Sequence, residues 1–153
     1  MPEIMFQYGL VFLGELHLRA FEAATPGKLR EDLEWVPAVY MLTMNEHLRA
    51  KAACHLEPES REIRWHDILA ADYGSGARAA IYWAFTLWSG RNWGGWEDDD
   101  GTLVPVVDAT AAAYSMDKIS RLVALVAIGY RWGLPGFLPP LAKRRPAINE
   151  RVV

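Results

Sequence analysis

The segment from Gly76 to Trp88 constrains the fold of this chain more than any other. It is rich in alanine, the strongest helix former, and Gly90 follows it where a helix end accepts a left-handed residue. Ser75, just before the segment, is a candidate N-cap. Apolar residues lie around most of the circumference of this predicted helix, so several neighbouring elements are needed to cover them. We therefore expect the central and most buried helix of a multi-helix domain here.

A second long segment with helical spacing runs from Pro37 to His55. Proline suits the first turn of a helix because its missing N–H is not needed there, and Pro58 ends the segment. The residues expected to fall near one face of this helix are Tyr40, Met44, His47, Lys51 and Cys54. Shorter helices are expected at 14–24, 28–35 and 65–71.

A third segment runs from Asp108, a candidate N-cap, to Trp132. Asp117 is a second candidate cap, which predicts a break near Ser115. Gly133, followed by a Leu-Pro pair, is a strong helix stop. The stripe that we expect to face the core consists of Ile119, Leu122, Val123, Val126 and Tyr130.

These segments predict a mostly α fold: a single compact helical domain of four to six helices. Its 153 residues suit one domain that can bury a full core without disulfides or metal. A short β element is expected near Thr102–Val104 or at the N-terminus, where apolar residues alternate from Ile4 to Phe12. The globular domain is predicted to span 1–138, and 139–153 to form a basic, proline-containing tail.

Charge and cysteine content narrow the classes of function. The net charge of −3 makes nucleic acid an unlikely partner, because a general binder needs a dominant positive field. A single cysteine, Cys54, fits a reducing compartment. The longest apolar run, Leu122 to Tyr130, is about half of what a membrane span needs, and the start of the chain lacks a basic signal-peptide region. We therefore expect a soluble, cytoplasmic protein with no membrane contact.

The segment 88–101 combines tryptophans, glycines and acids in a way that suggests a binding loop. Its aromatic residues, Trp88, Trp93 and Trp96, are candidate binding residues because flat rings bind sugars and peptide side chains. Glycoside hydrolysis needs two carboxylates, and the candidates here are Glu97, Asp98 and Asp100. The competing interpretation is that the tryptophans pin a glycine-rich loop to the core and the acids form its solvated edge.

Metal and cofactor patterns are absent from the sequence. An EF-hand aligned on Gly101 would place Trp96 and Val107 at ligand positions, and neither binds calcium. His47 and Cys54 share a predicted helix face, but zinc needs three or four converging ligands. The turn at 73–76 lacks the full phosphate-binding patterns, and no G-x-S-x-G elbow occurs. We therefore expect no metal, no cofactor and no catalytic residue.

The tail carries three adjacent basic residues, Lys143, Arg144 and Arg145, which are candidate contacts for an acidic partner. Prolines on both sides of them favour an extended backbone that can dock on another chain.

Seven tryptophans in a chain of this length are more than its core can bury completely. Partly exposed tryptophans on a rigid scaffold are typical interface anchors. The sequence therefore predicts a non-catalytic interaction or assembly protein whose partner is a protein, in the simplest case itself, as a homo-oligomer. The alternative is a small hydrolase that acts on a glycan through the loop 88–101.

Overall fold

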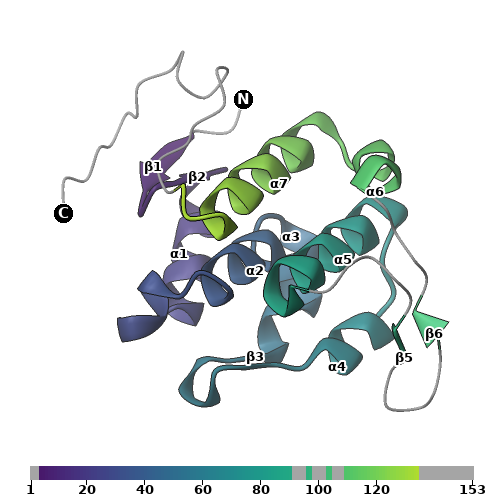
Figure 1. Cartoon of the computed structure of the whole chain (residues 1–153), viewed down its shortest axis with the longest axis horizontal. Helices are drawn as coiled ribbons and strands as arrows, with labels where there is room; N and C mark the ends of the chain where they lie inside the picture. The colour runs from purple at the N-terminus through teal and green to yellow at the C-terminus, as the bar shows by residue number, and fades with distance from the viewer. Residues whose placement is uncertain (1–3, 91–95, 98–102, 105–108, 135–153) are drawn as a thin grey trace.

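The computed structural model describes the backbone of residues 4–90, 96–97, 103–104 and 109–134, and the side chains of 4–90 and 112–134 (Figure 1). Within these ranges the chain forms seven α-helices: α1 (Glu15–Ala24), α2 (Trp35–Leu42), α3 (Glu46–Lys51), α4 (Trp65–Ala70), α5 (Ser75–Ser89), α6 (Ala109–Ser115) and α7 (Lys118–Arg131). Short 3-10 turns stand at η1 (Gly27–Glu31), η2 (Ala53–His55) and η3 (Pro58–Ser60). The mostly α fold is confirmed.

Short antiparallel strand pairs supplement the helices. They are β1 (Met5–Gln7) with β2 (Leu10–Phe12), β3 (Leu56–Glu57) with β4 (Glu62–Ile63), and β5 (Trp96–Glu97) with β6 (Leu103–Val104). Both places where a β element was expected, the N-terminus and Thr102–Val104, therefore contain one. The helix count exceeds the expected four to six because two long predicted helices are each divided.

The centre of the core is α2, all eight residues of which are buried. It packs against both α5 and α7 (Figure 1). The expectation that α5 is the most buried helix is wrong, because Trp83, Phe85 and Trp88 on α5 are only partly buried. The α2 segment contains almost no polar residue, so its whole circumference can be covered by neighbouring elements.

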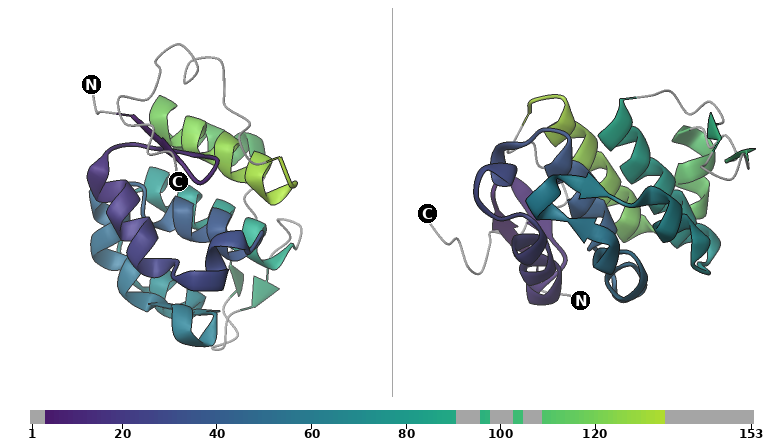
Figure 2. Two further views of the ribbon diagram at one scale, coloured as in Figure 1. Left: turned by 90° about the vertical axis from the view of Figure 1, so that its left-hand side faces the viewer. Right: turned by 90° about the horizontal axis from the view of Figure 1, so that it is seen from below.

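The β1–β2 hairpin lies beside α1 and α7 (Figure 2). Gln7 pairs with Leu10, so the connection has two residues, Tyr8 and Gly9. Their φ angles, +55° and +74°, are the positive values that a type I′ turn requires. Tyr8 is an unusual residue there, and its hydroxyl donates a hydrogen bond of 2.7 Å to Glu22 on α1, which ties the turn to that helix.

A buried imidazole connects the hairpin region, α1 and α2. Nδ1 of His17 accepts the backbone N–H of Leu13 over 3.2 Å, so Nε2 carries the proton and donates to the carbonyl of Tyr40 over 2.9 Å. The His17 ring stacks on the ring of Tyr40, whose hydroxyl donates to the carbonyl of Val11. Burial lowers the pKa of His17 to about 4, which keeps the ring neutral.

The predicted helix from Pro37 to His55 is two helices. Asn45 ends any continuation from α2, because its side chain accepts the N–H of Leu48 and caps α3. The single face expected from Tyr40 to Cys54 therefore does not form: Tyr40 is buried, whereas His47, Lys51 and Cys54 are exposed.

The start of α2 also differs from the prediction, which extended a polar helix through 28–35. The structure has a 3-10 turn at Gly27–Glu31 there, and α2 begins only at Trp35. The carboxylate of Asp32 accepts the backbone N–H groups of Glu34 and Trp35, so it starts α2 two residues before Pro37. A carboxylate at this place satisfies donors that a helix start leaves free.

The predicted break before α7 is confirmed, since Asp117 accepts the N–H of Ser120 over 2.7 Å. The stop at Gly133 is confirmed too: Gly133 has a φ of +76°, and Leu134 N–H donates to the carbonyl of Gly129. Ser75 does not cap α5, because it lies inside the helix and the N-cap is Gly74. Asp108 lies outside the described residues.

Candidate functional site

Most of the candidate site residues lie outside the part of the chain that the structure describes. The structure therefore does not test the glycan hydrolase alternative or the role of the basic tail, and both stay predictions. The residues concerned are Trp93, Asp98, Asp100, Lys143, Arg144 and Arg145, together with the side chains of Trp96 and Glu97 on β5.

Trp88 is the candidate binding residue that the structure describes with its side chain. It lies half-buried near the C-terminal end of α5, with its ring edge-on to Trp35 at 5.9 Å between centroids. The guanidinium of Arg61 lies 4.6 Å from its ring centroid. Asp32 and Glu34 hold that guanidinium in place at 2.6 and 3.2 Å. Trp88 thus contacts the core and a fixed cation, and its predicted binding role stays a prediction.

The helix α7 is fixed to its neighbours by side chains that bond to backbone. Trp83 on α5 donates its indole N–H to the carbonyl of Ala124 over 3.2 Å. Arg131 donates to the carbonyl of Leu87 over 2.9 Å. The hydroxyl of Tyr130 donates to the backbone carbonyl of Arg30 in η1 over 3.2 Å. Because these bonds lie along the C-terminal two turns of α7, that part of the helix has a defined position.

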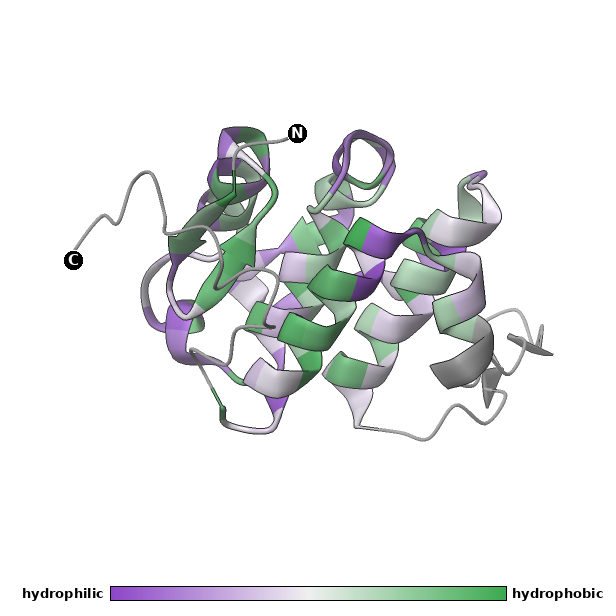
Figure 3. Ribbon diagram, turned by 90° about the horizontal axis from the view of Figure 1, so that it is seen from above, coloured by the Kyte–Doolittle hydropathy of each residue, from purple (hydrophilic) through white to green (hydrophobic). Residues whose placement is uncertain are grey.

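The side of α7 that points away from α2 carries large apolar residues in contact with solvent. We define the outer face of α7 as Arg121, Leu125, Ile128 and the C-cap residue Trp132, which follow one another at spacings of four, three and four. Leu125 is 48% exposed and Trp132 is 70% exposed. Figure 3, drawn from the side on which α7 lies, colours much of this helix as hydrophobic.

The inner face of α7 agrees only partly with the predicted core stripe. Val123, Val126 and Tyr130 are buried as expected and Leu122 is half-buried. Ile119 is 40% exposed, so its place in the stripe was wrong. It lies in the first turn of α7, and the buried residues of this helix begin only at Val123.

An apolar groove runs beside the outer face, between α5, α6 and α7. Its volume is about 160 Å³, and the residues that form most of its wall are Trp83, Ala112, Ala113, Met116, Leu125 and Ile128. Arg121 lies at its edge, and its Nε donates to the carbonyl of Ala113 over 2.6 Å. A cation at the carbonyl end of α6 is favourable, so the Arg121 side chain has a preferred position.

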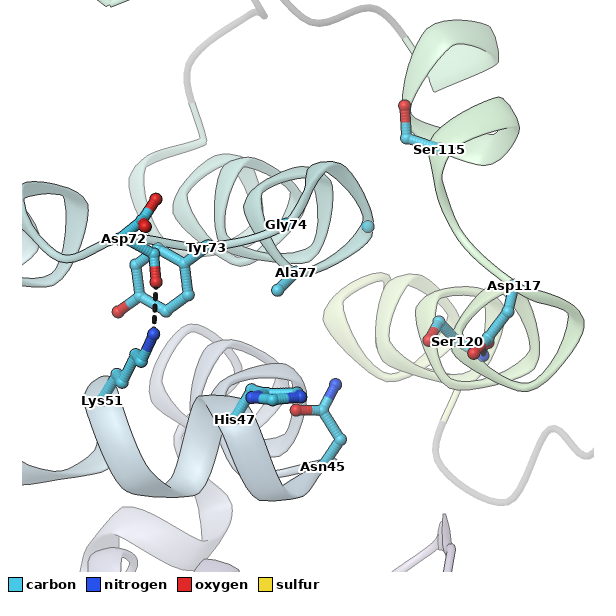
Figure 4. Close-up of a pocket in the computed structure, with 11 residues that line it drawn as sticks. Asn45, His47, Lys51, Asp72, Tyr73, Gly74, Ala77, Ser115, Asp117 and Ser120 are labelled. Carbon is cyan, nitrogen blue, oxygen red and sulfur yellow. Dashed lines mark hydrogen bonds between the residues drawn. The ribbon is translucent and has the colours of Figure 1, made fainter.

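A larger, polar pocket of about 600 Å³ lies where α3, α5 and α7 begin (Figure 4). Lys51 and Asp72 lie at one side of this pocket and Asp117 at the other (Figure 4). Lys51 donates to the carbonyl of Asp72 over 2.6 Å, and Asp117 caps α7. His47 lines the wall near Lys51 and is exposed. Two charged groups of this pocket, Lys51 and Asp117, therefore already bond to backbone.

The described residues hold no group of three or more His, Cys, Asp or Glu side chains that could bind a metal ion. His47 is on α3 and Cys54 is in η2, so they do not share one helix. In the same part of the chain, no helix combines the length and apolar character that crossing a membrane requires.

Comparisons with known proteins give no family for this chain: no family model matches, nor does any curated protein or solved structure. The function must therefore be inferred from its own residues. Among the described side chains, the outer face of α7 and its groove form an exposed apolar surface on a fixed helix. Sequence reasoning missed this surface because Trp83, Ala113 and Leu125 come from three separate helices.

Proposed function

We propose that this chain is a non-catalytic interaction protein that assembles with other copies of itself. The observation that carries the proposal is the outer face of α7, where Leu125 is 48% and Trp132 is 70% exposed. These two residues are seven apart on one helix, so they lie on the same side, two turns from each other. The proposal extends the expectation from the tryptophan count to a particular surface.

Single exposed apolar residues are normal on protein surfaces, but a contiguous set supports a binding role. Leu125 and Ile128 belong both to the outer face and to the wall of the groove, which joins the two features. Tryptophan and arginine are the residues most enriched at interface hot spots, and Trp132 and Arg121 occupy the two ends of this face. The composition therefore resembles the centre of an interface.

The stiffness of the scaffold also supports the proposal. Trp83 and Arg131 attach α7 to α5, and Arg121 is attached to α6. Side chains and helices that already have their bound positions lose little conformational entropy on association. A partner can therefore gain most of the free energy of burying Leu125 and Trp132.

Self-association is preferred over a different partner because a symmetric pair buries the same patch on both copies. One exposed surface is then enough to explain the whole assembly.

The test is the solution mass of the full chain, measured by sedimentation across a range of concentrations. A multiple of 17.2 kDa that dissociates on dilution is expected. A mass of 17.2 kDa at all concentrations up to about 100 μM, far above the dissociation constants of stable complexes, would contradict self-association.

A further inference from the structure

We propose that two copies of the chain pair through their α7 helices in antiparallel orientation, with a two-fold axis beside Leu125. This inference rests on the proposed self-association and adds the surface, the orientation and the register. The interface consists of the outer face of α7 and the adjoining groove.

The positions along α7 are symmetric about Leu125. Lys118 lies seven residues before it and Trp132 seven residues after it, which is roughly 10 Å along the helix axis in each direction. All three lie on one side of the helix because seven residues make almost two full turns. A two-fold axis perpendicular to α7 at Leu125 therefore places Leu125 against its own copy and Trp132 against Lys118 of the second copy.

Charge decides between antiparallel and parallel pairing. The fourteen residues of α7 include Lys118, Arg121 and Arg131 and no carboxylate. A parallel pair would place Arg121 against Arg121 and Lys118 against Lys118, and like charges placed opposite each other are unfavourable. No acidic residue of the helix could offset this repulsion.

An antiparallel pair brings Lys118 and Arg121 to the C-terminal end of the second α7. Arg131 belongs to that end too, but its Nε donates to the carbonyl of Leu87 on α5, so its guanidinium is held against α5. The carbonyl groups at that end carry partial negative charge, which attracts cations. The same end presents the ring of Trp132, 70% exposed, and an indole face is the best partner for a cation–π contact. Both effects favour the antiparallel arrangement over the parallel one.

The groove provides a place for the tryptophan of the second copy. In the antiparallel register, that Trp132 reaches the N-terminal half of α7, where Ala113 and Met116 line the groove and Arg121 lies at its edge. The alanines of α6 leave room for a large ring, and the bond from Arg121 to Ala113 holds the cation beside it. Shape and charge at this end of the groove therefore suit the proposed occupant.

Cysteine cross-linking of the full chain tests the geometry. Cys54, the only cysteine, is first replaced by serine. With Leu125→Cys added, mild oxidation or a short bis-maleimide should give a covalent dimer, because a residue at a two-fold axis meets itself. Leu16→Cys in the same background is the matched control, since Leu16 is an exposed leucine on α1, and it should stay uncross-linked.

Orientation is tested with Arg121→Cys and Ile128→Cys, which both lie on the outer face of α7, four residues before and three residues after Leu125. An antiparallel pair predicts that each variant alone stays monomeric on the gel, whereas an equilibrated mixture of the two gives a cross-linked dimer. Self-cross-linking of Arg121→Cys would overturn the antiparallel orientation.

The outcomes separate the two proposals. A wild-type oligomer that leaves Leu125→Cys uncross-linked would overturn the α7 pairing and leave self-association standing. A wild-type chain that is monomeric at every concentration would overturn both.

Discussion

The indole nitrogen of Trp83 on α5 donates a hydrogen bond to the backbone carbonyl of Ala124 on α7, 3.2 Å away. The bond joins two residues that are 41 apart in sequence, and it holds α7 against α5. Trp83→Phe keeps most of the ring but removes the donor. We expect it to lower the free energy of unfolding by about 1 kcal/mol, and Tm by roughly 2–4 °C.

Tyr114→Phe is the matched control for this change, because it removes a polar atom from an aromatic ring that is 83% exposed. Its effect on unfolding should stay within about 0.5 kcal/mol. Equal effects of the two variants in thermal unfolding would mean that the Trp83 bond does not stabilise the α5–α7 contact.

The buried His17 predicts a loss of stability in mild acid. Burial lowers its pKa from 6.5 in the unfolded chain to about 4 in the fold. Between these two values the unfolded chain binds the proton and the folded chain does not, so stability is full above pH 6.5 and falls as the pH falls to about 4. Through His17, the free energy of unfolding should fall by about 3 kcal/mol over this range.

Urea unfolding at a series of pH values measures this loss. His17→Gln removes the titrating ring. It should flatten the decline in the free energy of unfolding between pH 6.5 and 4, whether or not it also changes the stability at pH 7. His47→Gln replaces an exposed histidine and should leave the decline unchanged. An unchanged slope in the His17 variant would rule out the proposed cause.

Gly76 marks a close approach between α5 and α6. A Cβ at this position would stand 2.9 Å from the carbonyl oxygen of Ser115, closer than real Cβ atoms come to backbone. Gly76→Ala should therefore destabilise the fold by about 1–3 kcal/mol, although alanine is the better helix former. Gly74→Ala is the control, because nothing lies within 4 Å of its Cβ, and chemical denaturation should find it close to wild type.

Arg61 contributes through its contacts with Trp88 and Asp32. Burial raises the pKa of Asp32, but hydrogen bonds from Arg61 and from backbone N–H groups outweigh it and lower the pKa overall. Arg61→Ala removes a cation from the Trp88 ring and an ion pair from Asp32. Since Arg61 is 42% exposed, we expect a loss of only about 1 kcal/mol, together with a shift in tryptophan fluorescence.

Arg64→Ala is the comparison for Arg61→Ala. Arg64 is similarly exposed, at 41%, and pairs with Glu57 and Asp67. Arg64→Ala should lower the free energy of unfolding less than Arg61→Ala does, and it should leave the emission of Trp88 unchanged. A fluorescence change as large as that of the Arg61 variant would contradict the contact between Arg61 and Trp88.

Local signals predict the ends of α5 and α7 well. Gly90 and Gly133 both have positive φ at the predicted helix ends, and Asp117 caps α7 as expected. These features depend on residues within one or two turns, so the sequence contains all the information that they need.

Features that depend on distant residues could not be predicted in the same way. The helical spacing from Pro37 to His55 continues through the break, and only the side chain of Asn45 distinguishes two helices from one. The exposure of Leu125 depends on which side of α7 meets α2, and periodicity alone does not identify the side left uncovered. The candidate site is therefore a property of packing between helices.

The solution mass of two aspartate variants, measured beside wild type, tests the central claim most directly. Leu125→Asp and Leu16→Asp each place a charge at an exposed helical leucine, on the outer face of α7 and on α1 respectively. We expect wild type and Leu16→Asp to form the same oligomer, and Leu125→Asp to sediment at 17.2 kDa while keeping its helical circular dichroism. An oligomer that survives Leu125→Asp unchanged would contradict assembly through α7.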